Sequence, residues 1–510
     1  MFDPEKDALT LAVVGTGVMG QGIAQIAAQA GINVRLFDSS EGAAQRAHTA
    51  LASTWSKLAE RGRLTSDQAR AALARVSVAF AMQELADADV VVEAIVEKLD
   101  AKRTLFQQLE AIVSDRTVLA TNTSSLSVTA IAASCMHPQR VVGFHFFNPV
   151  PLMKIVEVIE GARTDPATCT AMLKLGQRMG HRAVRAKDTP GFIVNHAGRG
   201  FGTEALRLLG ESVGSPAAID AVLRGQAGFR LGPFELFDLV GLDVSVPVME
   251  SIYRQYFDEP RFRPSPLAVQ RLHAGLLGRK SGVGFYTYAN GSALPIHWSE
   301  RLACEPGPVW VSRHHAAWGD ACAAWLQGAG AQLESAPTPS ADALCIVLPL
   351  GADVSTCVAV QGLDAGRTVA LDWLLPQAQC AAIFTNPLTS TLSVNRAVSL
   401  LHPHTSSVRV MRDSLGLVGQ RVLAGIVNIA CDIAQQGIAS PQDIDAAVTL
   451  GLGYPQGPLA WGDALGAGLL LQILHNLQTA SGDPRYRPSP WLRRRAQLGA
   501  SLLTPEIDPD

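Results

Sequence analysis

The sequence predicts an α/β Rossmann-type domain followed by an all-α domain, then a degenerate α/β segment and a second copy of the all-α domain. Three observations support this prediction. A strand, a glycine-rich turn, a helix and a second strand open the chain, further apolar strands that end in polar residues follow, and the chain repeats itself at an offset of 225 positions. The boundaries suggested by these patterns are 1–187, 188–290, 305–408 and 409–505.

The opening pattern is typical of a dinucleotide site. Residues 9–14 are a short apolar run, as in a buried parallel strand. They lead into Gly15-Thr16-Gly17-Val18-Met19-Gly20 and then into a helical stretch, 21–30. A second strand, Asn33–Phe37, ends at Asp38, which lies 18 residues beyond the last glycine of the loop. Because these parts occur in order, we expect all six loop residues and Asp38 to bind a cofactor.

Each part of this pattern has a physical role. Gly15 permits a tight turn, Gly17 lets the backbone approach a pyrophosphate, and Gly20 allows close packing of helix and strand. The start of the helix offers free N–H groups to the anion. Asp38 would accept hydrogen bonds from a ribose and repel a 2′-phosphate, which favours NAD over NADP. FAD is the alternative dinucleotide, but the rest of the chain lacks the additional segments of a flavoprotein.

Composition bounds the remaining possibilities. The 510 residues suggest about three domains, at ~150 residues per domain. A charged fraction of 17% and a net charge of −3 do not favour nucleic-acid binding. The eight cysteines lack metal-ligand spacing, which argues against a metal site and suits a reducing cytoplasm. The acidic start does not resemble a signal peptide, and no apolar run reaches the ~18 residues of a membrane span. We therefore expect a cytoplasmic protein without a membrane partner.

The repeat indicates two copies of one helical unit. Both copies show apolar residues at helical spacing and share Gly-Pro and Pro-Ser-Pro breaks. The stretch between them, about 308–405, alternates short apolar runs with helical patterns but has no glycine fingerprint. We expect it to bind no NAD. The matched segments are Asp188–Asn195 with Asp413–Gln420, Gly228–Pro233 with Gly453–Pro458, and, after a shift of one residue, Pro260–Pro266 with Pro484–Pro490.

Polar residues follow the later strands of the first domain. Strands are expected at Ala88–Ile95, Thr117–Thr121 and Val141–Phe144. Ligands collect at the carboxyl ends of strands in an open parallel sheet, so Glu97 and Ser124 should lie near the nicotinamide. Ser124 could instead be the N-cap of a helix over 126–133.

A histidine and a glutamate flank the run HFFNPVPLMKIVE. His145 follows a predicted strand, and an imidazole suits proton transfer near neutral pH. Glu157 would fix its tautomer and favour its charged form. Taken alone, the pair is better explained as a core histidine and an unrelated glutamate, but the nucleotide site favours a base and its partner. Asn195 is either an ordinary helix-face amide or a group that reaches into the cleft.

Together these residues resemble the L-3-hydroxyacyl-CoA dehydrogenase family. The resemblance covers residues 8–290 through GxGxxG, VVVEAIVEKLDAK, TNTSSLS, HFFNPVPLMKIVE, KDTPGFIVN, FRLGPFEL and GRKSGVGFY. It implies NAD-dependent oxidation of an L-3-hydroxyacyl-CoA. It also implies that His145 is the catalytic base, Glu157 its partner, and Ser124 and Asn195 the ligands of the substrate oxygen. The positions implied to contact the nicotinamide half of NAD are Glu97, Lys102, Asn148 and Lys280, and those implied more loosely to meet CoA phosphates are Lys57 or Arg61.

The longer, duplicated layout resembles the branch that acts on 3-hydroxyadipyl-CoA in phenylacetate degradation. Relatives with this layout also act on 3-hydroxybutyryl-CoA, which is the alternative substrate. A terminal carboxylate would need a basic residue, and Arg199, Arg207 and Arg230 are candidates, although each is better explained as a surface or structural arginine.

Two other classes stay open at this stage. One is a non-catalytic, NAD-binding structural member of the superfamily. The other is a β-hydroxyacid dehydrogenase, which relies on a lysine where this chain has the His/Glu pair. Two-domain relatives pair their helical modules between subunits. We therefore expect either a monomer with an internal pseudo-dimer or a homo-oligomer.

Overall fold

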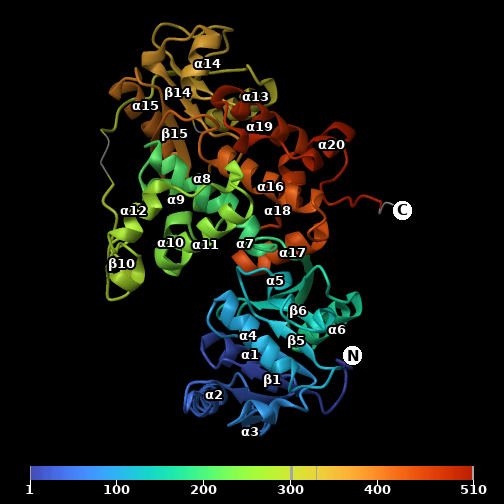
Figure 1. Ribbon diagram of the computed structural model, residues 1–510. Coiled ribbons are helices and arrows are strands. Elements are labelled where there is room, and N and C mark those ends of the chain that lie inside the picture. Colours follow the sequence, from blue (N-terminus) through green and yellow to red (C-terminus); the bar gives the residue numbers. More distant parts are fainter. Residues whose placement is uncertain (1, 299–301, 329, 508–510) are drawn as a thin grey trace. The chain divides into compact units, whose positions relative to one another are not determined.

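A computed structural model describes residues 2–298, 302–328 and 330–507. The chain forms two compact units (Figure 1). The first comprises the residues up to His196 together with Gln436–Leu452, and the second comprises Ala197–Gln435 and the residues from Gly453 onward. This division differs from the four segments drawn from the sequence, because residues 436–452 belong to the first unit and not with the rest of 409–505.

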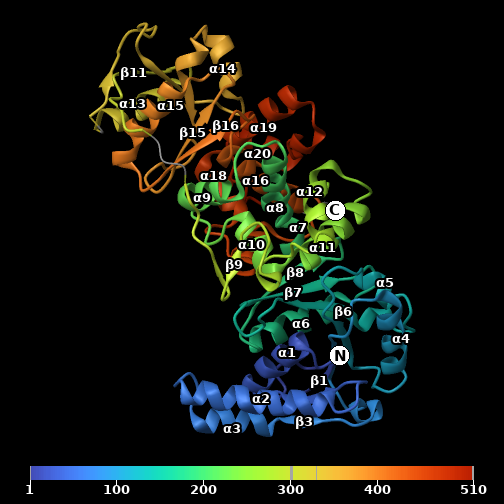
Figure 2. The ribbon, with the colours of Figure 1, turned by 90° about the vertical axis from the view of Figure 1, so that its left-hand side faces the viewer.

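The described part of the first unit contains an eight-stranded sheet in the order β3-β2-β1-β4-β5-β6-β7-β8 (Figure 2). Neighbouring strands are parallel except β6 and β7, which are antiparallel. The strands are β1 (Thr10–Val14), β2 (Asn33–Phe37), β3 (Val76–Val78), β4 (Val90–Glu93), β5 (Val118–Thr121), β6 (Val141–Phe146), β7 (Ile155–Glu160) and β8 (Arg182–Lys187).

Helices cover this sheet, as a parallel sheet with buried apolar strands requires. The core joins Leu11 and Val13 of β1 to Ile23 of the first helix and to Trp55 of the second. The helices of the unit are α1 (Val18–Gln29), α2 (Ala43–Glu60), α3 (Ser66–Ala74), α4 (Leu99–Glu110), α5 (Val128–Ala132), α6 (Pro166–Arg178) and α17 (Pro441–Leu452), with α7 (Val194–Ala197) at its boundary.

Several local expectations can be compared with these elements. The predicted strand Asn33–Phe37 is β2. The helix after the glycine loop begins earlier than expected, at Val18. The strand predicted to end at Phe144 continues to Phe146, because its ladder with β7 extends that far, so His145 lies within β6 and not after it. Ser124 is not a helix N-cap, because Ser127 caps α5 by accepting from the Ala130 N–H.

The second unit holds another α/β sheet among its described residues. Its strand order is β12-β11-β13-β14-β15-β16, and β14 and β15 are the antiparallel pair. The strands are β11 (Pro308–Val311), β12 (Gln332–Leu333), β13 (Leu344–Val347), β14 (Thr368–Leu371), β15 (Ala381–Thr385) and β16 (Val408–Arg412), and a separate hairpin joins β9 (Tyr288–Ala289) to β10 (Ser292–Ala293).

The remaining helices belong to the second unit. Among them α8 and α16 pack along each other. They are α8 (Arg199–Gly210), α9 (Pro216–Ala227), α10 (Pro233–Val240), α11 (Leu242–Gln255), α12 (Pro266–His273), α13 (Ala316–Gly328), α14 (Val354–Gln361), α15 (Thr391–Leu401), α16 (Gly419–Gln435), α18 (Pro458–Leu465), α19 (Ala467–Ser481) and α20 (Pro490–Leu498).

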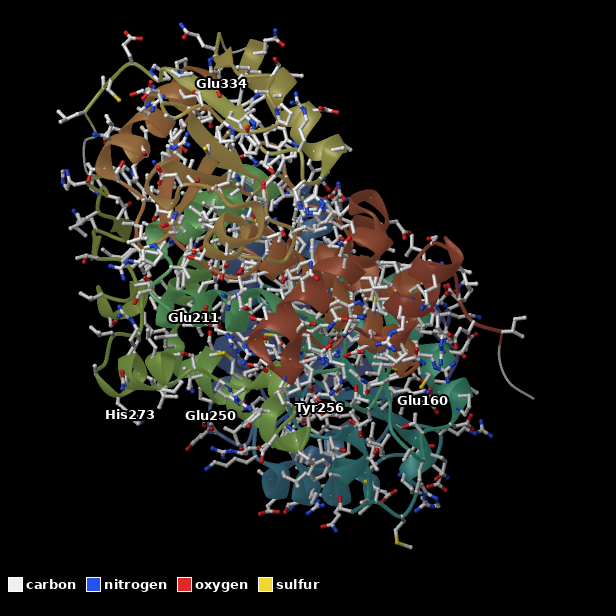
Figure 3. All side chains as sticks on the ribbon, turned by 90° about the horizontal axis from the view of Figure 1, so that it is seen from above. Glu160, Glu211, Glu250, Tyr256, His273 and Glu334 are labelled. Atoms are coloured by element: carbon white, nitrogen blue, oxygen red, sulfur yellow. The ribbon has the colours of Figure 1, made fainter. Side chains whose placement is uncertain are left out.

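A buried ionic cluster joins α8 to α16. Glu204 accepts hydrogen bonds at 2.7 Å from both Arg421 and the Tyr486 hydroxyl, and Arg485 lies 3.5 Å away. Arg421 also binds Glu211, which Figure 3 labels, at 2.6 Å. Burial alone would raise the pKa of Glu204, but Arg421 and Arg485 outweigh it and lower the pKa. The cluster is therefore ionised and fixes how the two helices meet.

Glu204→Gln should destabilise the protein by about 3–5 kcal/mol at pH 7, because it leaves buried guanidinium groups without their carboxylate. The lowered pKa means that Glu204 stabilises the fold above the unfolded pKa of ~4.3 and that this stabilisation is lost as the pH falls through the folded pKa. Denaturant unfolding at pH 7 and pH 4 should show that the difference in unfolding free energy between Glu204→Gln and the unaltered protein is smaller at pH 4. Glu250→Gln, which removes a more exposed pair with Arg254, is the control and should cost under ~1 kcal/mol. Equal effects of the two variants would contradict a stabilising cluster.

Candidate active site

The glycine loop between β1 and α1 has room for a ligand at one position only among its three glycines. Gly15 has φ +95°, and a Cβ there would lie 2.6 Å from the Ala94 carbonyl oxygen. A Cβ at Gly20 would lie 1.9 Å from the Gly15 carbonyl oxygen. A Cβ at Gly17 would meet no described atom within 4 Å. Gly17 therefore faces open space at the start of α1, where no side chain caps the helix N–H groups.

Asp38 holds this loop in place. Its Oδ2 accepts from the Thr16 N–H at 2.7 Å and from the Thr16 hydroxyl at 2.9 Å, and its Oδ1 accepts from the Ser40 N–H at 2.9 Å. Burial alone would raise the pKa of Asp38, but these donors outweigh it and lower the pKa. The carboxylate is ionised and half-buried, as a ribose acceptor should be.

A cavity of about 420 Å³ is lined by Phe37 and Ser39, the chain neighbours of Asp38. Its walls also include Ile95 and Leu105, and they are mostly apolar. An apolar cavity at the end of β2 fits the adenosine half of a dinucleotide.

His145 and Glu157 face each other across the antiparallel strands β6 and β7. The distance from His145 Nδ1 to Glu157 Oε2 is 2.7 Å. Only 4% of the surface of His145 is exposed, and none of Glu157 is. Because a carboxylate accepts, Nδ1 carries the hydrogen and Nε2 keeps its lone pair. The second oxygen of Glu157, Oε1, accepts from the N–H groups of Ile193 and Val194, each at 2.9 Å.

Asn195 and Ser124 are brought together next to this pair. Asn195 follows Val194 in α7, and its Nδ2 donates to the Ser124 carbonyl oxygen at 3.4 Å. The Ser124 N–H in turn donates to Glu97 Oε1 at 2.9 Å. Hydrogen bonds and one peptide link thus join Glu157, Asn195, Ser124 and Glu97 in a continuous series.

Lys102, a buried lysine, contacts Glu97 at the end of this series. Its ammonium is 1% exposed and lies between Glu93 and Glu97, 3.2 Å from Glu97 Oε2. Burial alone would raise the pKa of Glu97, but Lys102 and the donors at 123–125 outweigh it and lower the pKa. The ammonium of Lys102 is therefore held by two carboxylates.

The sequence did not single out three residues that organise this region. Glu93 binds Lys102 and also accepts from the Thr121 hydroxyl at 2.7 Å. Asn122 accepts from the Phe146 N–H at 2.8 Å, and Asp188 accepts from the Ser127 hydroxyl and from two N–H groups at the start of α5. Only Glu93 carried a signal, since a carboxylate that ends a wholly apolar strand needs a buried partner.

Other predicted ligands stand outside this hydrogen-bonded series. Lys57 and Arg61 are exposed at the end of α2, and Asn148 is exposed after β6. Lys280 belongs to the second unit, where its ammonium lies 2.7 Å from Asp243.

The three candidate arginines also belong to the second unit. Arg207 is held by Glu211 and Asp483, and Arg230 is exposed. Burial lowers the pKa of Arg199 to about 10.

Two further findings concern the described residues as a whole. They contain no group of three or more His, Cys, Asp or Glu side chains that could hold a metal ion. Across the same residues, no helix has both the length and the apolar character that crossing a bilayer needs.

The open glycine loop, the ionised acceptor at the end of β2 and the buried imidazole–carboxylate pair on the same sheet define an NAD-dependent dehydrogenase. Sequence comparison identifies which one. The family profile "3-hydroxyacyl-CoA dehydrogenase, NAD binding domain" matches residues 10–189, and "3-hydroxyacyl-CoA dehydrogenase, C-terminal domain" matches residues 191–288 and 416–501. The chain belongs to the 3-hydroxyacyl-CoA dehydrogenase family.

Individual relatives agree with this assignment. The 3-hydroxyadipyl-CoA dehydrogenase of Escherichia coli K12 is 39% identical over 96% of this chain and 98% of its own length. A probable 3-hydroxybutyryl-CoA dehydrogenase of Bacillus subtilis is 41% identical over 54% of this chain and 96% of its own. The crystal structure of an Escherichia coli K12 3-hydroxybutyryl-CoA dehydrogenase matches with a TM-score of 0.85 at 36% identity, covering 97% of this chain and 99% of the other.

Gly17→Ala should weaken NAD binding at least tenfold, or about 1.4 kcal/mol, and leave the Tm nearly unchanged, because the new methyl projects only into the ligand space. Gly20→Ala is the matched variant. It should lower the Tm strongly, because its methyl collides with the loop backbone. NAD titration and thermal unfolding of both proteins check this, and tight NAD binding by Gly17→Ala would contradict the assigned ligand position.

Proposed function

We propose that this NAD-dependent 3-hydroxyacyl-CoA dehydrogenase oxidises 3-hydroxyadipyl-CoA and uses His145 as its general base. The buried hydrogen bond of 2.7 Å between His145 and Glu157 carries the catalytic part of the proposal. Similarity to an Escherichia coli 3-hydroxyadipyl-CoA dehydrogenase over 96% of the chain supports the substrate. 3-Hydroxybutyryl-CoA is the second candidate, favoured by the name of the structure that matches with a TM-score of 0.85.

The proton step is assigned to His145. When bound, NAD would supply the hydride acceptor for C3 of the substrate. His145 Nε2 accepts the hydroxyl proton as C3 loses its hydride, so the alcohol becomes a ketone and the proton stays on the His145 imidazolium. Glu157 keeps Nδ1 as the donor and stabilises the positive charge as it forms. Because Glu157 also accepts two backbone N–H bonds, its orientation is fixed before substrate arrives.

Ser124 and Asn195 are assigned to the substrate oxygen. The hydrogen bond between the Asn195 amide and the Ser124 backbone supports a shared role, because it sets the two residues side by side. Asn195 also directly follows Val194, which binds Glu157, so the oxygen ligand and the base are fixed by the same short helix. The roles of Glu97, Lys102, Asn148 and Lys280 toward NAD, and of Lys57 and Arg61 toward CoA, stay predictions.

The chain also contains a second, altered copy of this architecture. Two contacts repeat at the 225-residue offset of the sequence. Asp413 accepts from N–H groups at the start of α14, as Asp188 does at the start of α5. The carbonyl of Val213 accepts from the Arg412 N–H at 2.8 Å, as that of Ile438 does from Lys187. The family profile for the C-terminal domain also matches twice. These repeats support four modules, two α/β and two helical.

The second copy is assigned no catalysis. At the same offset, alanines 370 and 382 stand for His145 and Glu157. Gln420 stands for Asn195, and its amide donates to Asp372 at 3.0 Å and to the Pro349 carbonyl at 2.9 Å. Asp372 is fully buried, and burial raises its pKa. A protein with one active site per chain and an internal pseudo-dimer of helical modules fits these features.

His145→Gln should lower kcat by about 10²–10⁴ and leave NAD affinity unchanged, because general-base catalysis is worth that factor and the nucleotide loop is untouched. Stopped-flow measurement of NADH formation, with NAD titration beside it, checks both parts. His137→Gln, an exposed histidine of the same unit, is the control. Near-normal turnover in His145→Gln would remove the base assignment, whereas NAD binding without NADH formation in the unaltered protein would favour a non-catalytic nucleotide-binding role.

Glu157→Gln separates the base from its partner. The imidazolium would lose its carboxylate, so the acidic limb of the pH–rate profile should move to lower pH as kcat falls. An unchanged profile would make Glu157 a purely structural residue.

Substrate preference and stoichiometry test the rest of the proposal. The rate of NADH formation should be highest with 3-hydroxyadipyl-CoA, lower with 3-hydroxybutyryl-CoA and negligible with free 3-hydroxybutyrate. Preference for the free acid would point to a β-hydroxyacid dehydrogenase, and preference for the butyryl thioester would select the second candidate.

Calorimetric titration should find one NAD per 510-residue chain. Two NAD per chain would overturn the inactive second copy.

A further inference from the structure

We propose that helix α17 positions the His145–Glu157 pair, with Gly451 as the contact residue. This inference rests on the proposed role of that pair. The helix, labelled in Figure 1, comes from the C-terminal part of the chain but belongs to the first unit. There it packs on β7 and β8. Strand β7 carries Glu157, so the helix lies against the strand that holds the carboxylate.

Two contacts anchor α17 and the residues just before it to β8. The Ile438 carbonyl accepts from the Lys187 N–H at 2.8 Å, and Asp443 lies 2.9 Å from the Arg182 guanidinium. Strand β8 is in parallel register with β7, and Glu157 is opposite Val184. A second bond, between Arg185 and Glu160 (labelled in Figure 3), ties the two strands together at 2.8 Å. The helix is therefore fixed to the pair of strands and not to a loop.

At Gly451, the end of α17 contacts Val194, the residue whose N–H binds the Glu157 carboxylate. A Cβ on Gly451 would lie 2.9 and 3.0 Å from the two Cγ atoms of Val194 and 3.6 Å from Cγ2 of Ile155. The Val194 N–H donates to Glu157 Oε1, and Ile155 lies two residues before Glu157 in β7. The helix thus contacts the residue that binds Glu157 and the strand that carries it, and only a glycine fits at that distance.

The second unit repeats the docking without the catalytic pair. Helix α9 packs on β15 and β16, and its Gly225 lies against Cys380. Cys380 stands 225 positions after Ile155. In both units, therefore, a helix packs on the last two strands of the sheet and has a glycine at the contact. In the first unit, the same contact also involves Val194, which binds Glu157, the partner of His145.

Gly451→Ala tests the inference in the full-length protein. The new methyl should displace Val194, whose N–H binds the Glu157 carboxylate. Because an ångström-scale misplacement of a catalytic group can cost about a hundredfold in rate, we expect kcat to fall about tenfold. The KM for NAD should stay unchanged, and the acidic limb of the pH–rate profile should move toward that of Glu157→Gln. Gly468→Ala is the matched control. It is a helical glycine of α19 with no described atom within 4 Å of a new Cβ, so it should leave kcat and the profile intact.

Val194→Ala and the double variant make the test independent of how well Gly451→Ala folds. Val194→Ala removes the contacted methyls and should lower kcat severalfold by leaving α7 loosely held. Adding Gly451→Ala to it fills the gap from the other side and should restore most of the activity and the original pH profile. A structural contact alone would change the Tm of these variants without moving the profile.

The outcomes separate this inference from the proposed function. Normal kcat and an unchanged profile in Gly451→Ala, or no recovery in the double variant, would overturn the positioning role while His145→Gln stays inactive. Retained turnover in His145→Gln would overturn the proposed function itself.

Discussion

The bond between His145 and Glu157 is the constraint on which the catalytic unit depends. A fully buried carboxylate needs hydrogen-bond donors for its oxygens, and here one oxygen accepts from the imidazole while the other accepts from the two N–H groups at 193 and 194. The antiparallel step in an otherwise parallel sheet makes this possible, because it sets the two residues directly opposite each other. One carboxylate thereby fixes the tautomer of His145 and the start of the helix that carries Asn195.

Buried charges are also paired in the neighbouring region. Glu93, Lys102 and Glu97 form a cluster in which one ammonium serves two carboxylates, and Glu97 then orders the Ser124 loop through its N–H. The loop geometry is thus set by charged groups, of which Glu93 and Lys102 are buried and Glu97 is partly exposed. The cluster of Glu204 and Arg421 does the equivalent for the helices of the second unit. In both clusters, removing one member leaves a buried charge without full compensation, which costs more than the pair itself contributes.

The glycine loop, strand β2 and the His/Glu pair could be predicted because each is a local pattern or a short segment. The partners of Glu93, Asn122 and Asp188 could not, because they lie on other strands and helices whose pairing the sequence does not state. Lys102 was matched to a ligand position, yet the fold encloses it between two carboxylates. The place of residues 436–452 was also hidden, since the sequence repeat groups them with the second helical segment while their packing partners are β7 and β8.

Helix α17 also has a consequence for biosynthesis. About 240 residues separate the two segments of the first unit along the chain. At ~5–20 residues per second, a ribosome needs about 12–50 s to make that stretch. During this interval the nascent first unit has its strands but not its last helix, and the apolar surface beside β7 and β8 is open to the cellular environment. Chaperone protection of that surface during translation would matter more for this chain than for one whose catalytic unit is contiguous.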